Sequence, residues 1–472
     1  MIKNTLEYRI TEDRIVEFEL AIQELIKNRN QMDQIMFDLH KDSLESQVIE
    51  MKENIQEYKD LKKSKKAFLI NNIEDIFYVL IKARIASGYT QEEMAKELKL
   101  DLDTYMKYEN NNFEGVEIAY IAKLIEVLKL ETSPDIDALI SVSKNDLIRK
   151  ISDTGLNSNF LMKRIYPERL SEISDTGLLN LLSSIQKIFK FKLKDLLNNT
   201  QLSLNIPNLQ VKYKLPESAN KNDVEIYTSY AYYIAELALK ATDHLQIKDI
   251  PNNPKDFYFA VQTIYGDINF ENVLRFTWDL GICVLPLNDN GMFHGAFWRR
   301  GGRNVIVLKQ KVRQESRWLF DLLHELWHAA QEPEKEERTI IDFEDENQLL
   351  EHEKEERVAN KFAANIVLSG KAEYLVQQCI DRSNGKIPYL KKVVQEVANE
   401  ENVPVGGLAN YLARRLSLQN QNWWGVANNL QTGEQNPWEL CRDVFFENID
   451  LDALDESEQL LLSNALFEGE EV

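Results

Sequence analysis

The stretch DLLHELWHAAQ, residues 321–331, places two of the chain's six histidines four positions apart. The apolar periodicity around it predicts a helix over 316–330, on which Phe320, His324 and His328 share one face. Two imidazoles on one face can bind one metal ion, and His-Glu-x-x-His is the spacing of a zinc site in which Glu325 acts on a water. The alternative is a pair of core or surface histidines. If the motif binds zinc, the chain must also supply a third ligand and a cleft.

The third ligand is sought downstream of this helix. The metzincin pattern continues with glycine and histidine, but Gln331 and Glu334 stand at those positions. Further on, EHEKEERVANKFAANIVLSG places Glu356 on the same helical face as the apolar residues of a second helix. We therefore predict Glu356 as the third ligand, with His352, one turn earlier on the same face, as an alternative. His294, in GMFHGAFW, is a candidate to approach the metal and steady an oxyanion.

Composition limits the class of protein. The chain has 472 residues, 44% of them hydrophobic, which suggests about three domains. No run of eighteen apolar residues occurs, and the N-terminus does not read as a secretion signal. Three widely spaced cysteines form neither a disulfide framework nor a thiolate metal site. We expect a protein of the reducing cytoplasm, without a membrane segment, and its charge of -21 repels nucleic acid on average.

The N-terminal part is predicted to be helical. Residues 1–64 alternate charged and apolar positions at helical spacing without proline or glycine, which indicates a helical arm that packs or forms a homodimer. Residues 65–135 have helix-turn-helix spacing: a helix ends near Ala86, Gly88 breaks it, and Thr90 caps the next with Glu93. Residues 136–205 are read as a second, degenerate helical bundle.

The helix-turn-helix segment resembles the XRE family of DNA-binding domains. The resemblance rests on Gly88, Gln91, Ala95 and Glu109, which match that family's pattern. It implies a DNA-facing surface, whose candidates here are Gln91, Tyr105, Lys107 and Asn110. Between Thr90 and Glu114, however, seven acids stand against three lysines, so phosphates meet the wrong charge. We expect DNA binding to be weak, and a protein-binding or structural role remains open.

Beyond two prolines, near 205–220, the pattern changes to a helix (FENVLRFTWDLG), two strands (ICVLPL and AFWRRGGRNVIVLKQ) and then the helix of the opening motif. The predicted fold class is a mainly α, multidomain protein: a helical N-terminal half with a helix-turn-helix, then an α+β zincin-like domain with a small sheet and a helical C-terminus. The domain boundaries are 220–420 for this second part and 421–472 for C-terminal helices. The acidic linker from Gln331 to Glu356, with twelve acids and three bases, is expected to be a solvated loop.

Residues 220–420 resemble the ImmA/IrrE metallopeptidase family. Besides His-Glu-x-x-His, the family has a second helix reading Glu-x-x-Ala-Asn-x-Phe-Ala and an arginine and a phenylalanine before the first motif. The matching residues here are Glu356, Ala359, Asn360, Phe362, Ala363, Arg317 and Phe320. One departure is Trp327, which stands where members usually have glycine before the second histidine.

The resemblance implies a cytoplasmic zinc-dependent endopeptidase that cleaves a repressor or antitoxin in a stress, mobile-element or phage-defence response. One Zn²⁺ is expected, held by His324, His328 and Glu356, with Glu325 as the general base. Two alternatives stay open. In the first, the chain is a helix-turn-helix regulator or antitoxin-like binder whose zincin domain is a non-catalytic sensor. In the second, it is a helical scaffold in a defence or toxin complex.

Overall fold

The structure is a computed structural model in which the chain divides into two compact units. Unit 1 comprises Met1–Lys187 and Phe191–Ser203, and unit 2 comprises Ile188–Lys190 and Leu204–Val472. The predicted boundary at 205–220 lies outside the described residues. The residues that the structure describes are 1–29, 32–64, 67–113, 116–154, 156–191, 193–197, 221–289, 293–309, 313–343, 352–431 and 435–467.

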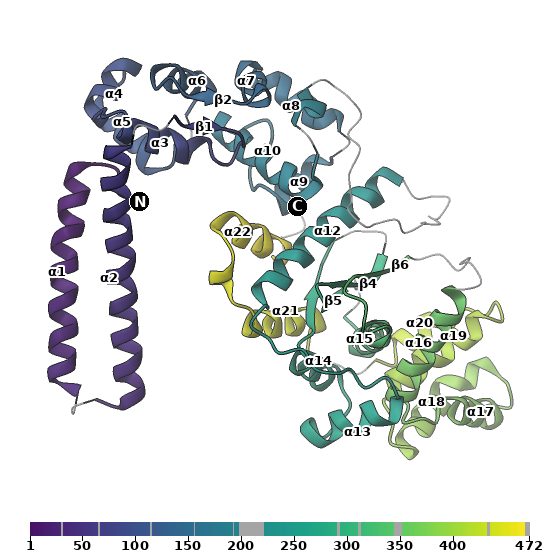
Figure 1. The fold of residues 1–472 in the computed structure, drawn as a ribbon. Coiled ribbons are helices and arrows are strands. Elements are labelled where there is room, and N and C mark those ends of the chain that lie inside the picture. Colours follow the sequence, from purple (N-terminus) through teal and green to yellow (C-terminus); the bar gives the residue numbers. More distant parts are fainter. Residues whose placement is uncertain are drawn as a thin grey trace. The chain divides into compact units, whose positions relative to one another are not determined.

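Unit 1 begins with a long helical hairpin, α1 (Thr5–Lys27) and α2 (Gln34–Lys63) (Figure 1). One side of α2 is buried at helical spacing, at Phe37, Val48 and Ile55 among others, while its exposed surface includes large apolar residues such as Leu39 and Ile49. Tyr8 and Tyr58 contact each other across the hairpin, with ring centroids 5.6 Å apart. The hairpin is thus a two-helix arm whose apolar seam faces inward.

The segment with helix-turn-helix spacing forms the helices α3 (Ile76–Ala86), α4 (Gln91–Leu98), α5 (Leu102–Asn110) and α6 (Ile118–Val127). As predicted, Thr90 and Glu93 form a capping box at the start of α4, and Gly88 has φ +79 in the preceding turn. Inside the bundle, Arg84 and Glu109 form an ion pair with exposed fractions of 3% and 0%. Because both charges are desolvated, each depends on the other.

The remaining elements of unit 1 are two short strands and five helices. The strands β1 (Leu69–Ile70) and β2 (Glu131–Thr132) pair in parallel. The helices are α7 (Pro134–Ser141), α8 (Lys144–Asp153), α9 (Ser158–Arg164), α10 (Asp175–Phe189) and α11 (Leu193–Leu197).

Unit 2 is built on a mixed four-stranded sheet in the order β3-β5-β4-β6. Its strands are β3 (Cys283–Pro286), β4 (Phe293–Arg300), β5 (Arg303–Leu308) and β6 (Arg338–Phe343). β3 and β5 are parallel, and β4 is antiparallel to both β5 and β6. Successive residues of β5 such as Val305 and Ile306 are both fully buried, so both faces of the sheet are covered. The helices that pack against β5 are α12 (Lys221–Ala241) and α15 (Glu315–Ala330).

Two sequence-based expectations for this sheet are corrected. The segment read as one strand, AFWRRGGRNVIVLKQ, forms two strands, because Gly301 and Gly302 adopt positive φ and turn the chain between β4 and β5. The acidic linker, expected to be a solvated loop, contains β6. Its Ile340 and Ile341 are buried against β4, and this pairing outweighs the acidic composition around it.

Helices surround the sheet and complete unit 2 (Figure 1). They are α13 (Pro254–Tyr265), α14 (Phe270–Asp279), α16 (His352–Val367), α17 (Ala372–Arg382), α18 (Ile387–Glu400), α19 (Val405–Ser417), α20 (Trp424–Asn428), α21 (Pro437–Asn448) and α22 (Glu456–Ala465). The fold is therefore mainly helical, with a small mixed sheet in unit 2, as predicted. Within the described residues, no helix has the length and apolar run needed to cross a bilayer.

Candidate metal centre

The helix α15 carries the His-Glu-x-x-His motif in its C-terminal half. Every residue from Leu322 to Ala329 is buried, because the sheet, α14, α16 and α19 all pack around this helix. The exposed fractions are 6% for His324, 1% for Glu325 and 0% for His328. Three polar side chains in such an interior need partners, so their mutual geometry is informative.

The second helix of the site, α16, brings Glu356 to the two histidines. Ala359 and Ala363 lie on its buried face, and their small side chains allow α15 and α16 to pack closely. Asn360 Nδ2 donates to the carbonyl oxygen of Glu356 at 2.6 Å, and Arg414 of α19 donates to Asn360 Oδ1 at 2.6 Å. The asparagine of the second motif therefore fixes the turn of α16 that carries Glu356.

Three potential ligand atoms meet at one point between these helices. His324 Nε2 lies 3.1 Å from His328 Nε2, and the Glu356 carboxylate oxygens lie 3.1 Å from His324 Nε2 and 3.2 Å from His328 Nε2. Donors about 2.0–2.1 Å from one tetrahedral ion are about 3.3 Å apart, which is close to these separations. Two imidazoles and a carboxylate also match the ligand types of a catalytic zinc site. The residues present therefore fit a divalent metal ion.

The charge state of Glu356 suits this role. Burial by itself raises the pKa of its carboxyl, but hydrogen bonds donated by His324 and His328 outweigh that effect and hold the pKa well below its usual value. Glu356 is thus ionised at neutral pH. None of the described residues hydrogen-bonds His328 Nδ1, so that ring is not oriented through its second nitrogen by a described side chain.

Glu325 lies beside this group without belonging to it. Among the side chains that the structure describes, the three atoms that cluster come from His324, His328 and Glu356. The Glu325 carboxylate is directed instead at the backbone of β4, where Gly295 leaves room for Oε1. The ring of Trp327, which is 9% exposed, lies edge-on to His328 with centroids 5.1 Å apart. Glu325 therefore lies against the sheet and Trp327 against one ligand, while the Glu356 side chain is 20% exposed.

Three further residues singled out in the sequence, His294, His352 and Arg317, are not part of the ligand group that the structure describes. His294 belongs to β4 and His352 begins α16, but both side chains lie outside what the structure describes. Of the family positions ahead of the motif, Arg317 packs over the Trp424 ring, with its guanidinium 4.9 Å from the centroid, and donates to Asn428. It therefore joins α15 to α20 and does not approach the metal group.

Two of the four side chains assigned to a DNA-facing surface lie in the interior instead. Gln91 Nε2 donates to Glu109 Oε2 at 2.6 Å, and Tyr105, 1% exposed, donates to Glu109 Oε1 at 3.2 Å. The buried Glu109 carboxylate needs these donors, which is why both side chains turn inward. Lys107 and Asn110 are exposed.

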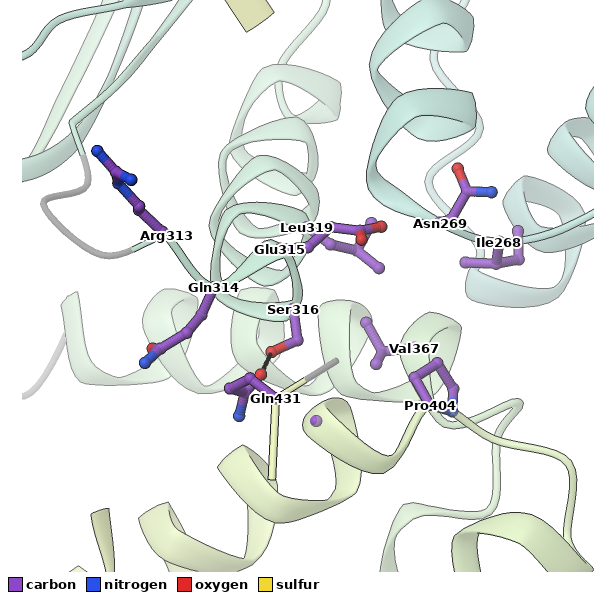
Figure 2. A pocket seen from close by; sticks show the side chains of 11 residues that line it. Ile268, Asn269, Arg313, Gln314, Glu315, Ser316, Leu319, Val367, Pro404 and Gln431 are labelled. Carbon is purple, nitrogen blue, oxygen red and sulfur yellow. Dashed lines mark hydrogen bonds between the residues drawn. The ribbon is translucent and has the colours of Figure 1, made fainter. Parts of the chain in front are cut away.

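The cavities described in unit 2 do not include the ligand residues. One, of about 200 Å³, lies at the first turn of α15 and is lined by Glu315, Ser316 and Gln431 among others (Figure 2). His324 is nine residues further along this helix, roughly 13 Å away. A wider hollow of about 680 Å³ lies between α13 and the end of α16, next to Asn365. Neither is lined by His324, His328 or Glu356.

Sequence reasoning missed three residues around the site: Gly295, Arg299 and Arg338. Gly295 borders Glu325, and the two arginines donate to carbonyl oxygens at the end of α15. Their positions depend on the pairing of β4 with β6, which was not predicted. No local signal marked Arg338, which stands in an acidic stretch of the sequence.

Two histidines and a glutamate on packed helices, beside a small mixed sheet, define a zincin-like domain with a group that could hold a metal ion. Residues 279–393 match the family model Peptidase_M78, the IrrE N-terminal-like domain. The matched segment runs from the end of α14 into α18 and contains the sheet, α15 and α16. It supports the ImmA/IrrE metallopeptidase family for this part of unit 2. The searches of curated proteins and of solved structures found no match to the chain.

Proposed function

We propose that this protein is a zinc-dependent endopeptidase that cleaves a regulatory protein. The proposal is carried by one observation: three ligand atoms lie 3.1–3.2 Å apart, and a second acidic side chain, Glu325, is adjacent but outside the ligand group. A purely structural site has no use for that acid, whereas a hydrolytic site needs a base next to the metal.

In this mechanism the residues divide into ligands and a proton carrier. His324, His328 and Glu356 would hold the ion, which when bound supplies Lewis-acid chemistry and lowers the pKa of a water to about 7. Glu325 takes a proton from the water that attacks the scissile carbonyl carbon. It then delivers that proton to the nitrogen of the leaving amine as the C–N bond breaks.

The substrate that we propose is a repressor or antitoxin-like protein, cleaved in a stress, mobile-element or phage-defence response. This assignment is supported by the match of residues 279–393 to the IrrE N-terminal-like domain and by the presence of a second unit that could select a partner. Unit 1 would then recognise the substrate or its binding site, and unit 2 would cleave it.

The substrate can be sought by comparing the protein ends that form in living cells. Cells producing the full-length protein or its His324→Ala variant are compared by mass spectrometry for new protein N-termini. We expect a small set of N-termini that requires the wild-type protein, with at least one in a transcriptional repressor or antitoxin. Identical sets in both cultures under every inducing condition would contradict a peptidase function.

A second function, a metal-dependent sensor without proteolysis, is favoured by one observation. Glu325 is only 1% exposed and His328 is fully buried, so a peptide does not reach them in this conformation. A sensor would keep the metal and change partner binding when it is lost. Zinc removal would then alter the partner's affinity, and the partner itself would stay intact.

For the helix-turn-helix of unit 1 we propose that DNA contact is weak and that proteins are its main partners. Gln91 and Tyr105 are committed to the buried Glu109, and the exposed residues around α4 and α5 are rich in acids. The full-length protein should bind duplex DNA no more tightly than the non-specific range of about 10⁻⁴–10⁻⁶ M at physiological salt. Nanomolar, sequence-selective retention of a promoter fragment in a filter-binding assay would disprove this.

A further inference from the structure

Arginines from the sheet hold the C-terminal end of α15. The last carbonyl groups of a helix have no partner within it and must be satisfied from outside. Arg299 Nη2 donates to the carbonyl oxygen of Ala329 at 2.6 Å, and Arg338 Nη1 donates to that of His328 at 2.5 Å. The two arginines face each other in the register of β4 and β6. The turn that carries a metal ligand is thereby fastened to the edge of the sheet.

Arg338 has a second set of partners, one on α16 and one just after the end of α15. Its Nη2 lies 3.4 Å from Glu355 Oε2, and its Nε lies 3.2 Å from Glu332 Oε2. Glu355 belongs to the first turn of α16 and directly precedes Glu356. The Arg338 side chain is 9% exposed, whereas those of Glu355 and Glu332 are 46% and 42% exposed. One guanidinium, with five donors in a rigid plane, therefore contacts both helices that carry ligands.

We propose that Arg338 is a positioning residue that sets the spacing between α15 and α16 at the metal centre. It does so by binding the backbone of His328 and the side chain of Glu355 at the same time. The inference rests on the proposed metal site, and it adds a residue outside the ligand group that determines how well the site binds its ion.

The geometry of the ligands explains why this spacing matters. His328 Nε2 and a Glu356 oxygen are 3.2 Å apart, but they come from two helices joined only through residues 331–351. A small shift of one helix along the other would separate these atoms without unfolding either helix. A metal-binding histidine is often oriented through its second ring nitrogen. None of the described residues hydrogen-bonds His328 Nδ1. We infer that the hydrogen bond from Arg338 to the carbonyl oxygen of His328 helps to hold this ligand in place instead.

Charge and positioning predict opposite effects of removing Arg338. A cationic side chain near the site repels a divalent cation, so electrostatics alone predicts that its loss strengthens metal binding. Positioning predicts the reverse, because loss of a residue that orients ligands typically weakens metal binding about 10–100-fold. The sign of the change therefore distinguishes the two effects.

The test uses the full-length protein and zinc itself as the probe. Zinc dissociation constants are measured by competition with a chromophoric chelator for wild type, Arg338→Ala and Arg338→Lys. The control is Arg382→Ala, because Arg382 of α17 pairs with Glu400 of α18 and neither residue belongs to α15 or α16. We expect about 10–100-fold weaker binding for Arg338→Ala, incomplete recovery for Arg338→Lys, which keeps the charge but not the planar fork, and no change for the control. Arg338→Ala binding zinc as tightly as wild type, or more tightly, overturns the proposal.

Two further measurements separate positioning from a loss of folding. The absorption spectrum of the cobalt-substituted protein reports ligand geometry, and we expect Arg338→Lys to change it while the circular dichroism of the apoprotein stays that of wild type. If Arg338 connects α15 to α16 through Glu355, the effects of Arg338→Ala and Glu355→Ala on zinc affinity are non-additive. Additive effects, or a cobalt spectrum of Arg338→Lys that equals that of wild type, overturn the proposal that Arg338 positions the two helices. Failure of the wild type to bind zinc would instead refute the proposed metal site itself, whereas absence of proteolysis would leave the positioning role standing.

Discussion

Gly295 on β4 leaves the space that the Glu325 carboxylate of α15 occupies. A Cβ added at Gly295 would overlap Glu325 Oε1, with no other side chain intervening. Glycine at this position therefore lets the acid approach the strand, and no left-handed backbone conformation calls for it. The pair shows how the sheet fixes the proposed general base without binding the metal.

The substitution Gly295→Ala should displace the Glu325 carboxylate and reduce proteolysis strongly, by up to the ~10²-fold expected for loss of a general base. Zinc content should stay near that of wild type, because no ligand is moved directly. Both quantities are measured on the same preparations. The matched control is Gly425→Ala, since a Cβ there meets no atom within 4 Å and the backbone is not left-handed. Full activity of Gly295→Ala would show that the position of Glu325 is unimportant.

A second prediction concerns the third ligand. Glu356→Ala removes one of three ligand atoms and should lower bound zinc far below one ion per chain, as measured by elemental analysis after gel filtration. The neighbouring Glu355 lies about 100° away around the helix and contacts Arg338. At saturating zinc, Glu355→Ala should therefore still bind one ion per chain. Equal zinc in wild type and Glu356→Ala would exclude this ligand and direct attention to His352.

The buried ion pair of unit 1 leads to a stability prediction. Arg84→Ala leaves the Glu109 carboxylate buried without its cation, which typically costs about 3–5 kcal/mol. All seven tryptophans lie in unit 2. In urea titrations of the full chain, the circular dichroism transition should therefore shift to lower urea, while the tryptophan fluorescence transition should not.

Lys96→Ala is the matched control for that experiment. Its partner Glu92 is exposed, and pairs of this kind contribute about 0–1 kcal/mol. Equal shifts for Arg84→Ala and Lys96→Ala would show that the buried network does not stabilise unit 1.

Local signals in the sequence predicted much of this fold. The capping box of Thr90 and Glu93, the break at Gly88 and the spacing of His324 and His328 depend on neighbours within one or two helical turns. Such signals are readable without the tertiary structure. The mainly helical class, the small sheet and the grouping of Glu356 with both histidines followed from them.

The features that were missed depend on contacts distant in the chain. β6 was hidden within an acidic stretch, and its pairing with β4 determines where Arg299 and Arg338 point. The inward turn of Gln91 and Tyr105 followed from the burial of Glu109, which composition does not reveal. An acid-rich segment predicts solvent on average, but strand pairing and buried ion pairs are decided by a few specific partners.

The central claim is that Glu325 acts as a base next to a metal that it does not bind. It is tested most directly by Glu325→Gln, measured for zinc content and for cleavage of the substrate identified from new N-termini. We predict one zinc per chain, as in wild type, with cleavage reduced at least ~10²-fold. His324→Ala should lose both zinc and cleavage. If Glu325→Gln retains the biological output while His324→Ala abolishes it, the metal site acts without hydrolysis and the peptidase assignment is wrong.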